Sequence, residues 1–257
     1  MKLSQYFLAL LCPIILLLSS CKKSTDEVAI DTKSTFSIEF ENQVNGSPLI
    51  LNTTTYKNAK GEDFKINVFK YYVSNIKLSK ADGTTYLIPE SYFLIDASKA
   101  ESTNITLKDV PTGDYTKIEY TIGVDYARNF AGAQTGALDP INGMFWTWNS
   151  GYIFVKLEGT SPQSLAPGNT LTFHIGGVTD PNNTIRTFAT EINAANPLRV
   201  RTDGKPNMHF KVNAAALFTG KTDVSFATLN MTMGGANSVI VANNYANGLF
   251  RLDHIHN

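Results

Sequence analysis

Short segments in which apolar and polar residues alternate recur along this chain, and this alternation constrains its fold more than any other feature. Residues 36–40 place apolar side chains at every second position, and residues 118–124 repeat the pattern. A period of two puts successive side chains on opposite faces of a β-strand that buries one face. The sequence therefore predicts strands and few helices.

Turn-forming residues separate these segments. Ala81-Asp82-Gly83-Thr84 is typical of a hairpin turn, and Pro111-Thr112-Gly113 marks a second turn. Many short strands at this spacing predict an all-β fold, a single antiparallel β-sandwich or barrel-like domain with long loops and one short helix at residues 214–218. The expected strands are residues 36–40, 49–56, 64–78, 92–96, 104–107, 115–124, 152–158, 170–178, 184–192, 208–212 and 249–256.

The amino-terminal segment is typical of a bacterial lipoprotein signal. Lys2 precedes the apolar residues 7–18, and the run ends in Leu18-Ser19-Ser20-Cys21. Cys21 is expected to be acylated and to become the first mature residue. A membrane-spanning helix is the less favoured alternative, because it needs about 20 apolar residues and Pro13 interrupts the run.

This signal sets the expected organisation and location of the chain. Residues 1–20 are the predicted signal peptide, residues 21–34 a flexible tether, and residues 35–257 the β domain. The expected location is the cell envelope, as an outer-membrane lipoprotein on the periplasmic or the surface-exposed face.

Charge and cysteine content exclude several function classes. The chain has 22 Lys+Arg and 22 Asp+Glu, so no basic patch for nucleic acid dominates it. Its two cysteines, Cys12 and Cys21, fall in the signal or at the lipid site, which leaves no thiol for a disulfide or a thiolate metal site. The sequence has no nucleophile elbow, HExxH helix, phosphate loop or acid–base dyad, so we expect a binding protein and not an enzyme.

The four histidines are candidate metal ligands. His174 and His209 alternate with apolar neighbours, so each is expected to face away from the core. His254 and His256 are two residues apart on a predicted strand, which puts both imidazoles on one face with Cα atoms about 6.6 Å apart. Such a pair can bind one copper or zinc ion. The alternatives are isolated surface histidines and a polar carboxyl-terminal tail.

The two tryptophans follow a long segment without periodicity, residues 125–142. Trp146 and Trp148 are two residues apart, so in an extended segment they project to the same side, and Met144 continues that row. Either these groups anchor a core, or they form a site whose side chains oxidise readily.

The most specific segments of the chain are FKYYVSNIKL (69–78), VPTGDY (110–115), IGVD (122–125), LDP (138–140), GMFWTWNSGY (143–152), KLEG (156–159) and FHIGG (173–177). Through these segments the chain resembles the MbnP-like copper-binding family from about residue 35 to the carboxyl terminus, and with its lipobox it resembles a Bacteroidota-type member.

The resemblance implies more than the residue patterns do. Family members are secreted or outer-surface proteins, often encoded beside a di-haem cytochrome c peroxidase-like partner. In characterised relatives that partner oxidises a tryptophan to kynurenine, and histidines bind copper together with the modified residue. Here the resemblance leaves open whether Trp146 or Trp148 is oxidised and which histidines are ligands, although His174 lies in a family-like segment.

The predicted function is therefore copper uptake, storage or buffering. The main alternative is a metal-free surface module that binds a glycan or another protein through the aromatic residues 144–152. A third possibility is a scaffold that serves as the electron-donating substrate of a haem partner.

Overall fold

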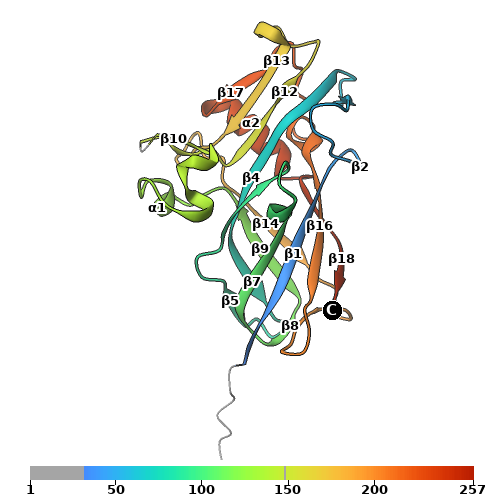
Figure 1. Ribbon diagram of the computed structural model, residues 1–257, viewed down its shortest axis with the longest axis vertical. Coiled ribbons are helices and arrows are strands. Elements are labelled where there is room, and N and C mark those ends of the chain that lie inside the picture. The colour runs from blue at the N-terminus through green and yellow to red at the C-terminus, as the bar shows by residue number, and fades with distance from the viewer. Residues whose placement is uncertain (1–31, 148) are drawn as a thin grey trace, which may run out of the picture. The chain divides into compact units, whose positions relative to one another are not determined.

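The long strand β4 (Asp63–Ser79) is the centre of the larger of the two main β-sheets in a computed structural model that describes residues 32–147 and 149–257 (Figure 1). The sheet runs in the order β14-β9-β4-β12-β13-β17, and three short strands also pair with β4. Its other strands are β3 (Tyr56–Lys57), β5 (Thr85–Leu87), β6 (Tyr92–Asp96), β9 (Lys117–Ile122), β12 (Val155–Thr160), β13 (Thr170–Ile175), β14 (Arg186–Glu191) and β17 (Met231–Met233).

The smaller sheet runs in the order β18-β16-β1-β2, with β7 also pairing with β1. Its strands are β1 (Lys33–Val44), β2 (Ser47–Pro48), β7 (Asn104–Pro111), β16 (Asn207–Asn213) and β18 (Phe250–His256). Two further pairs complete the described strands: β10 (Phe145–Thr147) with β11 (Gly151–Tyr152), and β8 (Gly113–Tyr115) with β15 (Leu198–Val200).

The helices of the described residues are short. They are α1 (Tyr126–Asn129), α2 (Gly235–Tyr245) and 3₁₀ turns at Ala100–Thr103, Gly136–Leu138, Pro140–Asn142, Pro167–Asn169 and Ala214–Leu217. None of the helices in the described part of the chain is long and apolar enough to cross a membrane.

The inner faces of the two sheets meet across a core rich in aromatic side chains. Phe40 of β1 lies 6.3 Å, centroid to centroid, from Tyr71 of β4, and the rings meet edge to face. Phe210 of β16 meets Tyr120 of β9 at 5.6 Å in the same manner. Edge-to-face pairs of this kind add stability beyond the burial of their area. The all-β sandwich predicted from alternation is confirmed.

One feature of the strand pairing was not visible in the sequence, and one predicted strand did not form. β1 pairs with β16 and β13 pairs with β17 in parallel, whereas the other pairings are antiparallel. Residues 49–56 were expected to form a strand, and this was wrong, because the segment turns at residues 51–53 and only Tyr56 lies in a strand. The Tyr56 hydroxyl bonds to the Ile50 N–H (2.7 Å) and to the Pro48 carbonyl (3.1 Å), which closes the turn.

Several local predictions hold. The hairpin turn at 81–84 joins β4 to β5, with Ser79 opposite Thr85. The expected helical turns at 214–218 form a 3₁₀ turn over Ala214–Leu217. The helix α2 was not expected, because its sequence lacks an apolar stripe of helical period.

The segment 125–142, expected to be a long loop, is held on the larger sheet by buried hydroxyl groups. Tyr72 donates to the Ala137 carbonyl at 2.9 Å, and Tyr152 donates to the Leu138 carbonyl at 2.6 Å. Asp125 caps α1 by accepting from the Arg128 N–H. The segment is therefore an ordered support for the strands β10 and β11 that follow it.

Candidate metal centre

A bulge in β18 puts consecutive polar residues on the same face of the smaller sheet. Leu252 pairs with Phe210 and His254 pairs with His209, so Asp253 is an extra residue without a partner in the register. The inward positions of β18 are Phe250, Leu252 and Ile255, and the outward ones are Arg251, Asp253, His254 and His256. Bulges often redirect a side chain in this way.

On this outward face the two carboxyl-terminal histidines meet. Their Nε2 atoms lie 2.9 Å apart. Two nitrogens bound to one ion at about 2.0 Å with a tetrahedral angle lie about 3.3 Å apart. A small rotation of either ring therefore makes room for an ion between them. The shared face follows from the two-residue spacing, as the sequence predicted.

His209 of the neighbouring strand β16 faces the same place. Its ring centroid lies 4.7 Å from that of His254, and its side chain is 13% exposed. Its Nδ1 atom is buried and has no hydrogen-bond partner among the described residues. One ligand atom from each of His209, Asp253 and His254 lies within 4.8 Å of the others. We refer to His209, Asp253, His254 and His256 as the histidine cluster.

Asp253 is placed to orient the cluster. Its Oδ2 atom lies 3.1 Å from His254 Nδ1 and 3.8 Å from His209 Nδ1. The hydrogen bond from His254 is the largest effect on the Asp253 carboxyl group and lowers its pKa, with help from Lys211 and Arg251. The carboxylate is therefore ionised at neutral pH and offsets the charge of a bound cation.

Further acidic groups surround His209. Glu39 and Glu41 of β1 place carboxylate oxygens 3.6 and 3.4 Å from its Nε2 atom. Lys211 lies 3.7 Å from Glu41 and 3.9 Å from Asp253, so one amine is shared between two carboxylates. Imidazole nitrogens and carboxylate oxygens are ligands suited to copper and zinc.

His174 is separate from the cluster, because it lies on β13 in the other sheet. It faces away from the core, as predicted, but its side chain is only 12% exposed. Its Nε2 atom lies 2.8 Å from Glu158 Oε1. Burial lowers the pKa of the imidazole, and the hydrogen bond with Glu158 opposes this only in part. The imidazole is therefore neutral at neutral pH and could act as a ligand.

The methionine and tryptophan candidates have unlike surroundings. Met144 is fully buried in a small apolar cluster with Tyr72 and Tyr152. Trp146 is half-buried on β10 and borders a cavity of about 420 Å³ together with Met233. Trp148 and the predicted lipidation site Cys21 lie outside the described residues, as does the predicted signal peptide 1–20.

Asp253 was not among the ligands predicted from the sequence, although the sequence contains a signal for the bulge that exposes it. The inward residues Leu252 and Ile255 are three positions apart and not two, which marks an inserted residue in the strand. Nothing local in the sequence placed His209 beside β18, because the order of strands in a sheet depends on long-range packing.

Comparison with known proteins shows which family this chain matches. A family model described as MbnP matches residues 33–237. The solved structure of MbnP from Methylosinus trichosporium is similar, with a TM-score of 0.54 and 14% identity over 79% of this chain and 83% of that chain. A search of curated proteins found no match.

The matched segment includes Met144, Trp146, His174 and His209, and it ends before β18. Asp253, His254 and His256 are therefore features of this chain outside the matched residues. The similarity to the solved structure supports the two-sheet fold, and the family model covers most of the sequence. The chain belongs to the MbnP family.

Proposed function

We propose that this protein binds copper at the histidine cluster and serves in copper uptake, storage or buffering at the cell envelope. The MbnP family, to which the chain belongs, is associated with copper. The proposal depends above all on one observation: on one face of the smaller sheet, His254 lies close both to His209 and Asp253 and to His256.

The cluster fits a metal ion better than it fits a purely structural role. A buried imidazole nitrogen normally has a hydrogen-bond partner, because leaving it unpaired costs free energy. The Nδ1 atom of His209 has none among the described residues. A metal ion bound there would satisfy that nitrogen.

Each residue of the cluster then has a distinct part. His254 and His256 would bind through Nε2, and His209 would supply the third imidazole. The Asp253 carboxylate accepts from His254 Nδ1, so it holds that ring with Nε2 available. Neutral imidazoles suit both oxidation states of copper, so no thiolate is needed. This is a binding function and not a catalytic one.

Calorimetric titration of the mature chain with Cu(II) tests this proposal. The double variant His254→Ala/His256→Ala should lose most of the heat of binding. His174→Gln is the control, because it removes an imidazole from the other sheet and should leave the cluster intact. Unchanged Cu(II) binding in the folded double variant would contradict the proposal.

Location, modification and partner complete the proposed function. The lipobox supports attachment through Cys21 to the outer membrane. The family resemblance supports oxidation of Trp146 or Trp148 to kynurenine by a di-haem cytochrome c peroxidase-like partner. Trp146 lies half-buried beside a surface cavity, which an oxidising partner could approach.

The alternative function, binding of a glycan or a protein through residues 144–152, has less support. Of the described aromatic residues of this segment, Tyr152 is fully buried and Phe145 and Trp146 are half-buried, so none of these three rings is largely exposed for stacking.

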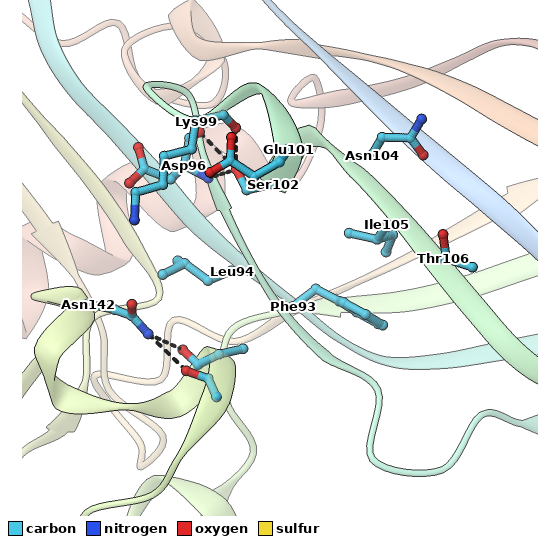
Figure 2. A pocket seen from close by; sticks show the side chains of 12 residues that line it. Phe93, Leu94, Asp96, Lys99, Glu101, Ser102, Asn104, Ile105, Thr106 and Asn142 are labelled. Atoms are coloured by element: carbon cyan, nitrogen blue, oxygen red, sulfur yellow. Dashed lines mark hydrogen bonds between the residues drawn. The ribbon is translucent and has the colours of Figure 1, made fainter.

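A hollow of about 390 Å³ lies elsewhere, between β6, β7 and the 3₁₀ turns at 136–142 (Figure 2). Two of the polar side chains that line it are already paired. Asn142 donates to two carbonyls, and the Ser102 hydroxyl bonds to the Asp96 backbone. These two side chains therefore gain little from a ligand, and we favour copper binding at the histidine cluster.

A further inference from the structure

Two methionines on the edge strand β17 differ from the others in the described part of the chain. Met231 and Met233 are each 58% exposed, whereas Met144 and Met208 are fully buried. A thioether is oxidised to a sulfoxide when an oxidant reaches its sulfur atom. In the folded protein, an oxidant in solution therefore meets the two sulfurs of β17 before those of the core.

The position of β17 explains this exposure. It is the last strand of the larger sheet, and it pairs on one side with β13. Thr232, between the two methionines, is buried, and its hydroxyl donates to the Gly234 carbonyl at 3.0 Å. Because side chains alternate along a strand, Met231 and Met233 both project from the outward face.

A sulfoxide is tolerated at these two positions. Oxidation turns an apolar thioether into a polar group with an acceptor oxygen. Burying such a group without a partner costs free energy, so oxidation of Met144 or Met208 would disturb the core. At Met231 and Met233 water solvates the new oxygen, and the backbone pairing of β17 with β13 needs neither sulfur.

Met233 also borders the cavity of about 420 Å³ that Trp146 lines. The indole lies near the residue that follows Met233, since a Cβ built at Gly234 would be 4.0 Å from Trp146 Cη2. Ser150 and Asn182 line the same cavity, and a hydroxyl and an amide can both donate a hydrogen bond to a sulfoxide oxygen. Oxidation of Met233 therefore makes the cavity wall beside the indole more polar.

We propose that Met231 and Met233 are a site of reversible oxidation by hydroperoxides, and that the sulfoxide at Met233 changes the polarity of the cavity beside Trp146. The site shares no residue with the histidine cluster, so this proposal does not rest on copper binding.

The chemistry is the transfer of one oxygen atom. A sulfur lone pair attacks the outer oxygen of the hydroperoxide, and the S–O bond forms as the O–O bond breaks. The sulfur loses two electrons and the peroxide gains them. The proton of the outer oxygen moves to the other oxygen, which leaves as water or an alcohol. Methionine sulfoxide reductases reverse the change.

Treatment of the folded mature chain with hydrogen peroxide, without added metal, tests the oxidation. Trypsin separates the candidates into the peptides 222–251 (Met231 and Met233), 202–211 (Met208) and 129–156 (Met144). We expect one added oxygen at each exposed methionine. The buried methionines should react at least about tenfold more slowly, because their sulfurs must wait for local opening. In the urea-unfolded chain all four should react at similar rates, which is the control for exposure.

Tryptophan emission measures the effect on the cavity. Peroxide should shift the emission of the folded chain, and the two stereospecific methionine sulfoxide reductases should restore both mass and emission. Met233→Leu should abolish the shift, because leucine keeps a similar volume without the sulfur. Met231→Leu is the matched control and should keep the shift. Trp146→Phe should remove it, which assigns the signal to that indole.

Three results would overturn the proposal. The first is equal oxidation of exposed and buried methionines while circular dichroism shows the chain folded. The second is unchanged emission in the wild type after both exposed methionines are oxidised. The third is a peroxide-induced shift in Met233→Leu equal to that of the wild type, because the change would then arise elsewhere.

Discussion

His254 and His256 approach within 2.9 Å, Nε2 to Nε2, on a strand whose regular register is broken one residue earlier by Asp253. The bulge and the imidazole pair therefore lie next to each other on β18 and on the same face of the sheet. The bulge adds a carboxylate to the face that already holds both rings, and β16 adds His209 from the side.

Two variants of Asp253 separate its two contributions, which are the bulge in β18 and the carboxylate that orients His254. Deleting the residue would restore a regular alternation, with Leu252 and Ile255 inward and both histidines outward, so the fold should persist. Copper affinity should fall by roughly 10- to 100-fold, because the group that orients His254 is gone. Asp253→Asn keeps the bulge and an acceptor oxygen and should lose less. A deletion variant that binds as tightly as the wild type in calorimetry would show that Asp253 has no part in the site.

Glu62 should make stability depend on pH in the acid range. Its carboxylate accepts from Asn58, Ser225 and the Phe226 N–H at 2.7, 2.7 and 2.8 Å. Burial raises the pKa of this carboxyl group, but these hydrogen bonds outweigh burial and lower it overall. A depressed pKa means that the unfolded state binds the proton more readily, so stability is full above about pH 4.5 and is lost as pH falls further.

The variant Glu62→Gln tests this. It should be less stable at pH 7 by roughly 1.5–3 kcal/mol, the range for hydrogen bonds to a charged group. Its stability should also change less than that of the wild type between pH 5 and pH 3. Urea unfolding at several pH values measures both effects. Parallel pH curves for the two proteins would argue against the assignment.

The contact between Gly176 and Trp146 leaves no room for a side chain. A Cβ at Gly176 would lie 2.5 Å from the Tyr152 carbonyl oxygen and 2.8 Å from the indole. Gly176→Ala should therefore cost about 1–3 kcal/mol through overpacking and shift the tryptophan emission. Gly204→Ala, where the nearest atoms lie at 3.8 and 3.9 Å, is the matched control. Equal thermal midpoints for the two variants would contradict the tight packing at Gly176.

Cys21 is expected to carry the lipid. Cys21→Ser should leave the protein unlipidated and soluble in the periplasm, because the acceptor thiol is lost. Detergent partitioning and intact mass of protein from a bacterial lipoprotein-processing host measure this. Partitioning of the variant into the detergent phase as for the wild type would reject the lipobox interpretation.

Oxidation of one tryptophan is expected when the natural haem partner is present. Kynurenine formation replaces one carbon by one oxygen, and mass spectrometry of the tryptic peptide 129–156 detects that change. Fragment ions then assign it to Trp146 or Trp148. Protein made without the partner is the control and should be unmodified. Unmodified peptide from the native host would remove this part of the proposed function.

The sequence by itself determined the local geometry of this protein. Alternation set which side chains face the core, so His174 and His209 point outward and His254 shares a face with His256. These features follow from the two-residue period of a strand, which depends only on the local sequence.

Only the tertiary structure decided which outward side chains meet. β16 and β18 lie side by side, which joins His209 to His254, while β13 pairs with β17 in the other sheet and joins His174 to Met233. Strand order and parallel pairing arise from packing between segments far apart in sequence, where aromatic residues such as Phe40 and Tyr71 fill the space between the sheets. Local periodicity carries no information about such long-range neighbours. The sequence therefore could not show that three of the four candidate histidines lie together in the smaller sheet and that His174 lies apart from them in the larger one.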